Sequence, residues 1–147
     1  MDKVYLFFLT FFYVGKIDYA PGTVTSLITA ILWFYFIPHN YIFQLCLIFI
    51  LLVVSLFLCY QYSLKNSDKD PSFIVIDEVV GMSIALFMIP QKIILYSMAF
   101  VIFRFLDITK PLFISYSEKV NNGVGIVLDD VISGILTVLM LNLYYII

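Results

Sequence analysis

Carboxylates occur in two adjacent pairs along this chain, Asp77-Glu78 and Asp129-Asp130, and each pair lies beside a long apolar run. Neighbouring helical residues point about 100° apart, so one member of a pair can bind an ion while the other orients or pairs with it. Carboxylates gathered without His or Cys form a hard oxygen site that suits Mg²⁺. The alternative is helix-end capping and dipole compensation, which explains Asp129 and Asp130 better than Asp77 and Glu78.

A glycine follows each carboxylate pair by about one helical turn, at Gly81 and at Gly134. Without side chains, these positions allow a neighbouring helix or a ligand to approach the carboxylates closely.

Two cations and a third acidic residue follow a helical spacing at Arg104, Asp107 and Lys110. Arginine holds a phosphate through a fork of donors and lysine holds it as a point charge. Snorkelling to lipid headgroups is the alternative, and it fits Lys110 alone equally well. Asp107 between the two cations favours an organised network that binds phosphate.

Two helix starts add possible phosphate ligands. Ala20-Pro21-Gly22-Thr23 offers backbone N–H groups and the hydroxyl of Thr23, and Gly123-Val124-Gly125 precedes the last helix. Such helix N-termini bind anions, although glycine and threonine are also ordinary residues at helix starts. Asp70 before Pro71 is either an N-cap or a ligand.

The composition is that of a membrane protein. Of the 147 residues, 63% are hydrophobic and 12% are charged, whereas soluble domains carry about 25% charged residues. The length predicts one domain, residues 1–147. A net charge of −2 without a dense basic patch argues against nucleic-acid binding. The single histidine, His39, lies in a turn and argues against phosphohistidine chemistry.

The apolar runs predict an all-α integral membrane bundle of about five hydrophobic helices, preceded by a retained interfacial helix within residues 1–15. Asp70-Pro71 and Pro111 supply a start and a stop signal. The expected helices cover residues 24–37, 41–60, 71–89, 92–109 and about 128 to the C-terminus.

The turns between these helices predict the orientation in the membrane. Alternate turns share a side, so residues 15–23, 61–78 and 104–130 face one way. Seven Lys and Arg residues lie on that side, against one on the other: Lys3, Lys16, Lys65, Lys69, Arg104, Lys110 and Lys119 against Lys92. The positive-inside rule places the polar clusters on the cytoplasmic face of a multi-pass protein.

Four ordered blocks of this chain resemble the bacterial phosphatidylglycerophosphatase A family. They are Ala20–Thr23, Ile74–Met82, Phe103–Pro111 and Gly123–Asp130. The resemblance implies a Mg²⁺-dependent lipid phosphatase of the bacterial inner membrane that converts phosphatidylglycerophosphate to phosphatidylglycerol. The chain departs from the common family pattern at Ser72, Thr25, Leu106 and Phe113, none of which removes a carboxylate or a cation.

The resemblance carries nine positions over as site residues: Thr23, Asp70, Asp77, Glu78, Arg104, Asp107, Lys110, Asp129 and Asp130. We expect Asp77, Asp107 and one of the pair Asp129-Asp130 to hold the metal. Glu78 or the other member of that pair acts as base or orients the attacking water.

Two alternative functions differ in where the carboxylates lie. A cation-coupled transporter would place them near the middle of the bilayer along a path for the ion. A non-catalytic subunit of a lipid-synthesis complex would keep the helices and lose some of the carboxylates. This chain has all of them, and they fall on one predicted face.

Overall fold

Helices and turns, without a strand, make up the part of the chain that the computed structural model describes, residues 3–66, 71–111 and 123–146. The elements are α1 (Lys3–Leu9), the 3-10 helix η1 (Val14–Lys16), α2 (Pro21–Phe36), α3 (Tyr41–Lys65), α4 (Ile76–Ala85), α5 (Ile93–Thr109) and α6 (Val124–Ile146). The predicted all-α class is confirmed.

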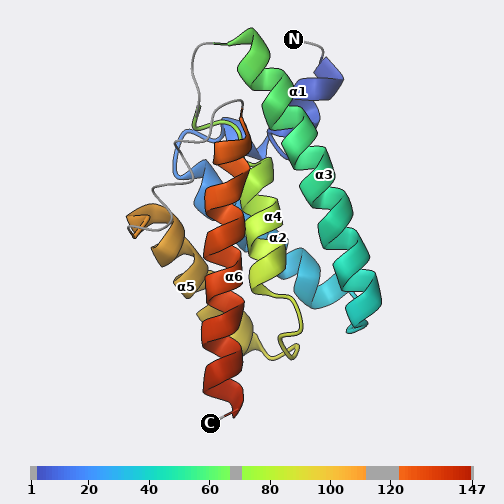
Figure 1. The fold of residues 1–147 in the computed structure, drawn as a ribbon, viewed down its shortest axis with the longest axis vertical. Coiled ribbons are helices and arrows are strands. Elements are labelled where there is room, and N and C mark those ends of the chain that lie inside the picture. The colour runs from blue at the N-terminus through green and yellow to red at the C-terminus, as the bar shows by residue number, and fades with distance from the viewer. Residues whose placement is uncertain (1–2, 67–70, 112–122, 147) are drawn as a thin grey trace.

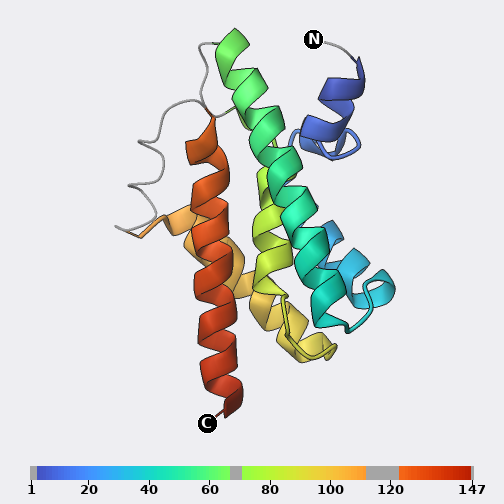
Figure 2. The same ribbon diagram turned by 45° about the vertical axis from the view of Figure 1, so that its right-hand side comes forward.

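The long helices alternate in direction. In Figure 1 and Figure 2, α2, α4 and α6 run one way, and α3 and α5 run the other. The starts of α2, α4 and α6 therefore lie toward the same end of the bundle as the ends of α3 and α5. α4 contacts α2, α3, α5 and α6, so it occupies the centre of the bundle. This alternation agrees with the succession of turns that the sequence predicts.

Local signals explain several helix boundaries. Pro21 is the first residue of α2, where its fixed φ suits a helix start. The side chain of Asn40 caps α3 by accepting a hydrogen bond from the N–H of Phe43 at 3.1 Å. α5 ends at Thr109, before Lys110 in a left-handed conformation and Pro111, as expected for a proline stop.

The predicted start of the fourth helix at Pro71 is wrong, since α4 begins at Ile76. The N–H of Val75 donates to the carbonyl of Leu9 at 3.2 Å, which fixes the preceding segment against the N-terminal region instead of in a helical turn. Asp77 and Glu78 consequently lie in the first turn of α4. Helix-dipole compensation therefore applies to them, contrary to the sequence-based interpretation.

The predicted start of the last helix near residue 128 is also wrong, because α6 begins at Val124. Gly123 precedes it with φ of 72°, and a Cβ atom at this position would overlap the carbonyl of Cys59. Asp129 and Asp130 therefore lie beyond the first turn of α6. Capping, the alternative considered for this pair, does not explain their positions.

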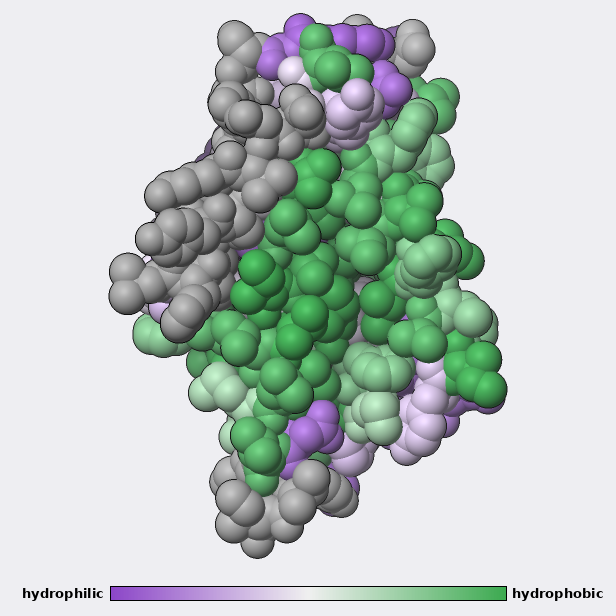
Figure 3. Space-filling view, in the orientation of Figure 1, coloured by the Kyte–Doolittle hydropathy of each residue, from purple (hydrophilic) through white to green (hydrophobic). Residues whose placement is uncertain are grey.

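Large apolar side chains cover the outside of the bundle as well as its core. Trp33, Met82 and Phe103 belong to the buried core, whereas Ile42 and Phe49 on α3 are 76% and 65% exposed. Figure 3 shows this hydrophobic surface in the middle of the molecule, with hydrophilic residues toward the end where α3 finishes. An exposed apolar surface of this size marks contact with a membrane or a partner.

Two of the described helices are long and apolar enough to cross a membrane, at Tyr41–Lys65 and Val124–Leu143. A hydrocarbon core of about 30 Å needs roughly 20 helical residues. α2 has 16 residues, α4 has 10 and α5 has 17, so they are shorter than this length. The count of about five hydrophobic membrane helices stays a prediction.

Candidate active site

Two glycines bring α4 and α6 into backbone contact, which we call the α4–α6 seam. A Cβ atom on Gly81 would lie 2.7 Å from the backbone oxygen of Asp130, and one on Gly134 would overlap the backbone oxygen of Gly81. Larger residues would force the two helices apart. The prediction that these glycines permit a close helix approach is confirmed.

Three carboxylates meet beside the seam. Asp77, Glu78 and Asp130 each offer an oxygen, and these three oxygens lie within 4.8 Å of one another. Asp77 and Asp130 are buried, with 6% and 3% of their surfaces exposed, and Glu78 is half-buried. Helical side chains tilt toward the helix N-terminus, so Asp130, whose carbonyl lies against Gly81, reaches back toward the first turn of α4.

This cluster fits a hard divalent cation. Mg²⁺ binds oxygen ligands at about 2.1 Å, and three carboxylate oxygens within 4.8 Å of one another can approach a shared ion through small side-chain rotations. The Oε2 atom of Glu78 is buried and has no hydrogen-bond partner among the described residues. A buried acceptor left unpaired costs stability, and a cation would compensate both this atom and the crowded negative charge.

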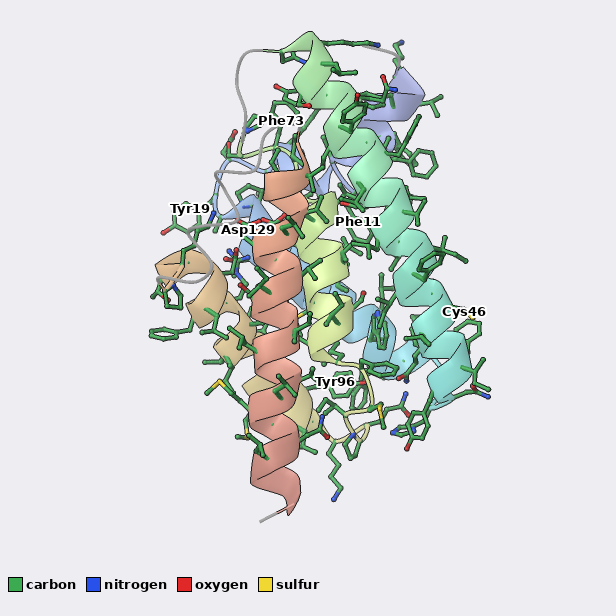
Figure 4. The ribbon with its side chains drawn as sticks, in the orientation of Figure 1. Phe11, Tyr19, Cys46, Phe73, Tyr96 and Asp129 are labelled. Atoms are coloured by element: carbon green, nitrogen blue, oxygen red, sulfur yellow. The ribbon has the colours of Figure 1, made fainter. Side chains whose placement is uncertain are left out.

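Two ion pairs flank the carboxylate cluster. The Nη1 atom of Arg104 lies 2.5 Å from Oδ2 of Asp107, and Nζ of Lys110 lies 2.7 Å from Oδ2 of Asp129. The first pair is within α5, and the second joins the end of α5 to α6. In Figure 4, Asp129 lies on the part of α6 that is close to α5. Asp107 also interacts with Asp130. The expected pairing of Asp107 with Arg104 is present, whereas Lys110 forms an ion pair with Asp129.

The start of α2 closes the site from another side. A Cβ atom on Gly22 would overlap Oε1 of Glu78 and would lie 3.4 Å from Nη1 of Arg104. Only glycine therefore admits the Glu78 carboxylate at this position. Ala20, the N-cap of α2, makes no side-chain capping hydrogen bond, so N–H groups in the first turn remain available to an anionic ligand.

These parts enclose a cavity of about 430 Å³ between α2, α4, α5 and α6. It is lined by eight of the nine predicted site residues: Thr23, Asp77, Glu78, Arg104, Asp107, Lys110, Asp129 and Asp130. The ninth, Asp70, lies outside the described residues. The structure thus brings together the polar clusters that the sequence spreads over 108 positions, from 23 to 130.

The grouping inside the cavity differs from the expected one. Asp107 was expected to hold the metal, and in the structure its carboxylate pairs with Arg104. Asp129 faces Lys110, so Asp130 is the member of its pair that joins the cluster. Glu78, expected as a base or as a residue that orients water, lies within the cluster itself.

Four residues of the cavity wall were not predicted: Ser72, Ile74, Ile108 and Ile126. Ile126 precedes Asp130 by four residues and so shares its helix face, a spacing that could have identified it. Ser72 and Ile74 belong to the segment that turns before α4. Their position depends on the contact between Val75 and Leu9, for which the sequence carries no local signal.

Comparison with known proteins gives a family match over most of the chain. The family model described as Phosphatidylglycerophosphatase A matches residues 7–145. A Phosphatidylglycerophosphatase A of Escherichia coli (strain K12) is 33% identical over 129 residues, which cover 84% of this chain and 73% of that relative. One of Haemophilus influenzae is 38% identical over 130 residues, 86% of this chain and 79% of the relative.

A further relative has a different named substrate. It is a protein of Bacteroides thetaiotaomicron whose name proposes a phosphatidylinositol-3-phosphatase, and it is 30% identical over 134 residues. The matched region covers 86% of this chain and 84% of that relative. No solved structure matches the chain.

Proposed function

Because this chain belongs to the phosphatidylglycerophosphatase A family, we propose that it is the enzyme that removes the terminal phosphate of phosphatidylglycerophosphate during phospholipid synthesis. One observation carries the proposal: a single cavity combines three clustered carboxylates with Arg104 and Lys110. Hydrolysis of a phosphomonoester needs cationic groups for the phosphate and a means to activate water.

Asp77, Glu78 and Asp130 are the proposed Mg²⁺ ligands, because their oxygens lie closest together and one of them is unpaired. When bound, the ion supplies Lewis-acid polarisation of the phosphoryl group and activation of a water molecule. Asp107 and Asp129 lie beside the cluster and hold Arg104 and Lys110 in place through ion pairs.

Arg104, Lys110 and the start of α2 are proposed to bind the phosphate. The guanidinium group and the ammonium group can each donate to phosphate oxygens while keeping their carboxylate partners. Thr23 and the first turn of α2 also line the cavity, and Gly22 lies beside Arg104. Together these donors stabilise the charge that develops on the equatorial oxygens in the transition state.

The proposed reaction is a hydrolysis. A water oxygen forms the new bond to phosphorus, and the bond between phosphorus and the glycerol oxygen breaks. A carboxylate of the cavity takes a proton from the water and passes it to the leaving glycerol oxygen, so that inorganic phosphate and the lipid alcohol are the products. The candidates for this base are Asp129 and the carboxylate oxygen of Glu78 that does not bind the ion.

We place the whole chain in the membrane as one phosphatase domain, with α3 and α6 as full spans and the cavity facing the cytoplasm. The exposed apolar surface and the two long apolar helices support the insertion. Among the described cations, Arg104, Lys110 and Lys65 lie near helix ends that share one side, and Lys92 lies before α5 at the other side. The acyl chains of the substrate can then stay in the bilayer while the headgroup enters the cavity.

The rival functions fit this arrangement less well. A cation-coupled transporter needs carboxylates along a path through the bilayer, whereas the described ones converge where α2, α4 and α6 begin. A non-catalytic subunit has no need of a complete set of carboxylates and cations. Phosphatidylinositol 3-phosphate, suggested by the name of the Bacteroides relative, is a second candidate substrate with the same phosphomonoester chemistry.

Phosphate release by the purified protein tests the proposal. Phosphatidylglycerophosphate and phosphatidylinositol 3-phosphate should be presented in the same detergent micelles, with Mg²⁺ and with a chelator. We expect Mg²⁺-dependent release from phosphatidylglycerophosphate. Equal or faster release from the inositol lipid would reassign the substrate, and no release from either would refute the proposed function.

A further inference from the structure

A second cavity lies between α2 and α5, farther along α2 and nearer the start of α5 than the residues of these helices that line the polar cavity. Its volume is about 320 Å³, and we call it the α2–α5 groove. Leu27, Ile31 and Phe34 line it from α2, and Phe100 and Val101 line it from α5. From Leu27 to Tyr35 the groove follows α2 for about 12 Å, given a rise of 1.5 Å per residue.

The groove continues the helix faces that line the active-site cavity. On α2, Leu27 follows Thr23 by four residues, and Ile31 follows Leu27 by four more. On α5, Arg104 follows Phe100 by four residues. Residues spaced by three or four share one face of a helix, so the same faces line the polar cavity at one end and the apolar groove at the other.

Two small side chains line the groove, and the larger apolar side chains at its rim are partly exposed. Ala30 and Ser97 line it from the two helices. Leu27 and Ile31 are each 47% exposed, and Val101 is 63% exposed. An apolar molecule can therefore enter from the side of the bundle, which is the direction from which a bilayer supplies lipid.

We propose that the α2–α5 groove binds an acyl chain of the phospholipid substrate while its headgroup lies in the polar cavity. This inference rests on the proposed function. The direction of the groove suits it, because a lipid at the membrane face carries its acyl chains away from the headgroup and into the hydrocarbon. Because the groove follows the polar cavity along the same faces of α2 and α5, substrate lipid is a better occupant than lipid bound to the surface at random.

Filling the groove tests the proposal. Ser97→Trp adds a large side chain from an exposed position, and Ile31→Trp does so from α2 as an independent variant. Ile94→Trp is the matched control, because Ile94 is an exposed residue of α5 that does not line this groove. Each variant is assayed with dioleoyl phosphatidylglycerophosphate and with the deacylated, water-soluble headgroup phosphomonoester.

We expect both groove variants to lose about tenfold in kcat/KM for the dioleoyl substrate, as if roughly two methylene groups were no longer buried. Turnover of the deacylated substrate should stay at the wild-type value, and the control should match wild type on both substrates. The proposal would be overturned if both groove variants kept the wild-type ratio of kcat/KM between the two substrates, either because activity is unchanged or because both substrates lose equally.

A binding measurement separates this inference from the proposed function. A phosphatidylglycerophosphate analogue with a photoreactive diazirine in one acyl chain is irradiated with the wild-type protein and with the variants. We expect labelling of residues 27–35 and 93–101 that excess unlabelled phosphatidylglycerophosphate removes and that Ser97→Trp reduces. Labelling that phosphatidylcholine removes equally well would show a general lipid site and overturn the inference, even if the phosphatase activity is confirmed.

Discussion

α4 packs against α6 through backbone atoms at Gly81 and Gly134, whereas α2 and α5 leave an apolar groove open beside Ala30 and Ser97. The seam lies beside the polar cavity, and the groove follows that cavity along α2 and α5. In the seam, a single added methyl group would meet backbone atoms that cannot rotate away. In the groove, the rim side chains are exposed and free to adjust.

This difference matches two separate tasks. Carboxylates that share a metal ion must keep their spacing to within a few tenths of an ångström, and a glycine-tight helix contact provides such a fixed frame. A lipid tail has no fixed shape, so its site needs an apolar surface and an open side more than a rigid geometry. Substitutions in the seam should therefore affect stability and metal binding, and substitutions on the substrate-binding surfaces should affect kinetics alone.

The largest effect is expected at the carboxylates held by the seam. Asp77→Asn keeps the shape of the side chain and removes the charge that a metal ligand needs, so activity should fall on the order of 10²-fold or more. Phosphate release and thermal unfolding are measured together. Asp18→Asn, at an exposed position outside the cavity, is the control and should retain activity.

The same variant distinguishes a catalytic carboxylate from one that only compensates the α4 dipole. If Asp77 only compensated the α4 dipole, its replacement would cost about 0.3–1 kcal/mol of stability and would leave turnover unchanged. Near-normal turnover in Asp77→Asn would therefore support the structural explanation and remove Asp77 from the proposed metal site.

The second prediction concerns the helix contact in the α4–α6 seam. An alanine in an exposed helix stabilises a protein by about 0.5–1 kcal/mol relative to glycine. At Gly134 the added methyl group would meet the Gly81 carbonyl and would lie 3.0 Å from Cβ of Ile84. We expect Gly134→Ala to destabilise the fold by about 1–3 kcal/mol and to lower activity with it. Thermal unfolding in detergent measures the first effect, and Ser97→Ala in the open groove serves as the control.

An unchanged or raised melting temperature in Gly134→Ala would show that α4 and α6 can separate at little cost. The comparison between a rigid seam and an adaptable groove would then fail.

The sequence predicted the helical class, and eight residues that the fold brings into one cavity, better than it predicted helix ends. Carboxylates beside apolar runs are costly without a function, and this physical cost identified Asp77, Glu78 and Asp130. The start of α4 was missed because Pro71 is a good local start signal. A hydrogen bond from Val75 to the distant Leu9 overrides that signal, and no local pattern reports it.

The sequence also did not predict all the ion pairs inside the site. Spacing showed that Asp107 accompanies Arg104 on one helix, and their ion pair follows from that spacing. The pair between Lys110 and Asp129 joins two helices, so it depends on how α5 meets α6. For the same reason the sequence could not decide between Asp129 and Asp130 as the residue nearer Asp77.

A smaller effect is expected at Gly22, where the start of α2 meets Glu78 of α4. A methyl group there would meet the end of the flexible Glu78 side chain, which can rotate away, instead of a rigid backbone. Gly22→Ala should therefore leave the melting temperature close to wild type while activity falls about tenfold, because Glu78 is displaced from the cluster. Kinetics and thermal unfolding on one preparation check both parts. A loss of stability as large as that of Gly134→Ala would contradict the distinction between the two glycines.

The smallest effect is expected on the phosphate side, at Arg104. Arg104→Lys keeps the positive charge near Asp107 but loses the planar fork that can serve a carboxylate and a phosphate together. Losing about one hydrogen bond, worth roughly 1 kcal/mol, should lower kcat/KM about fivefold. The control is Lys92→Arg, a reciprocal exchange on the opposite side of the bundle, which should leave the kinetics unchanged. A loss of activity in Arg104→Lys as large as that in Asp77→Asn would show that Arg104 is essential for catalysis. The geometry of the phosphate-binding residues would then matter as much as that of the carboxylate cluster, and the proposed division of tasks would be wrong.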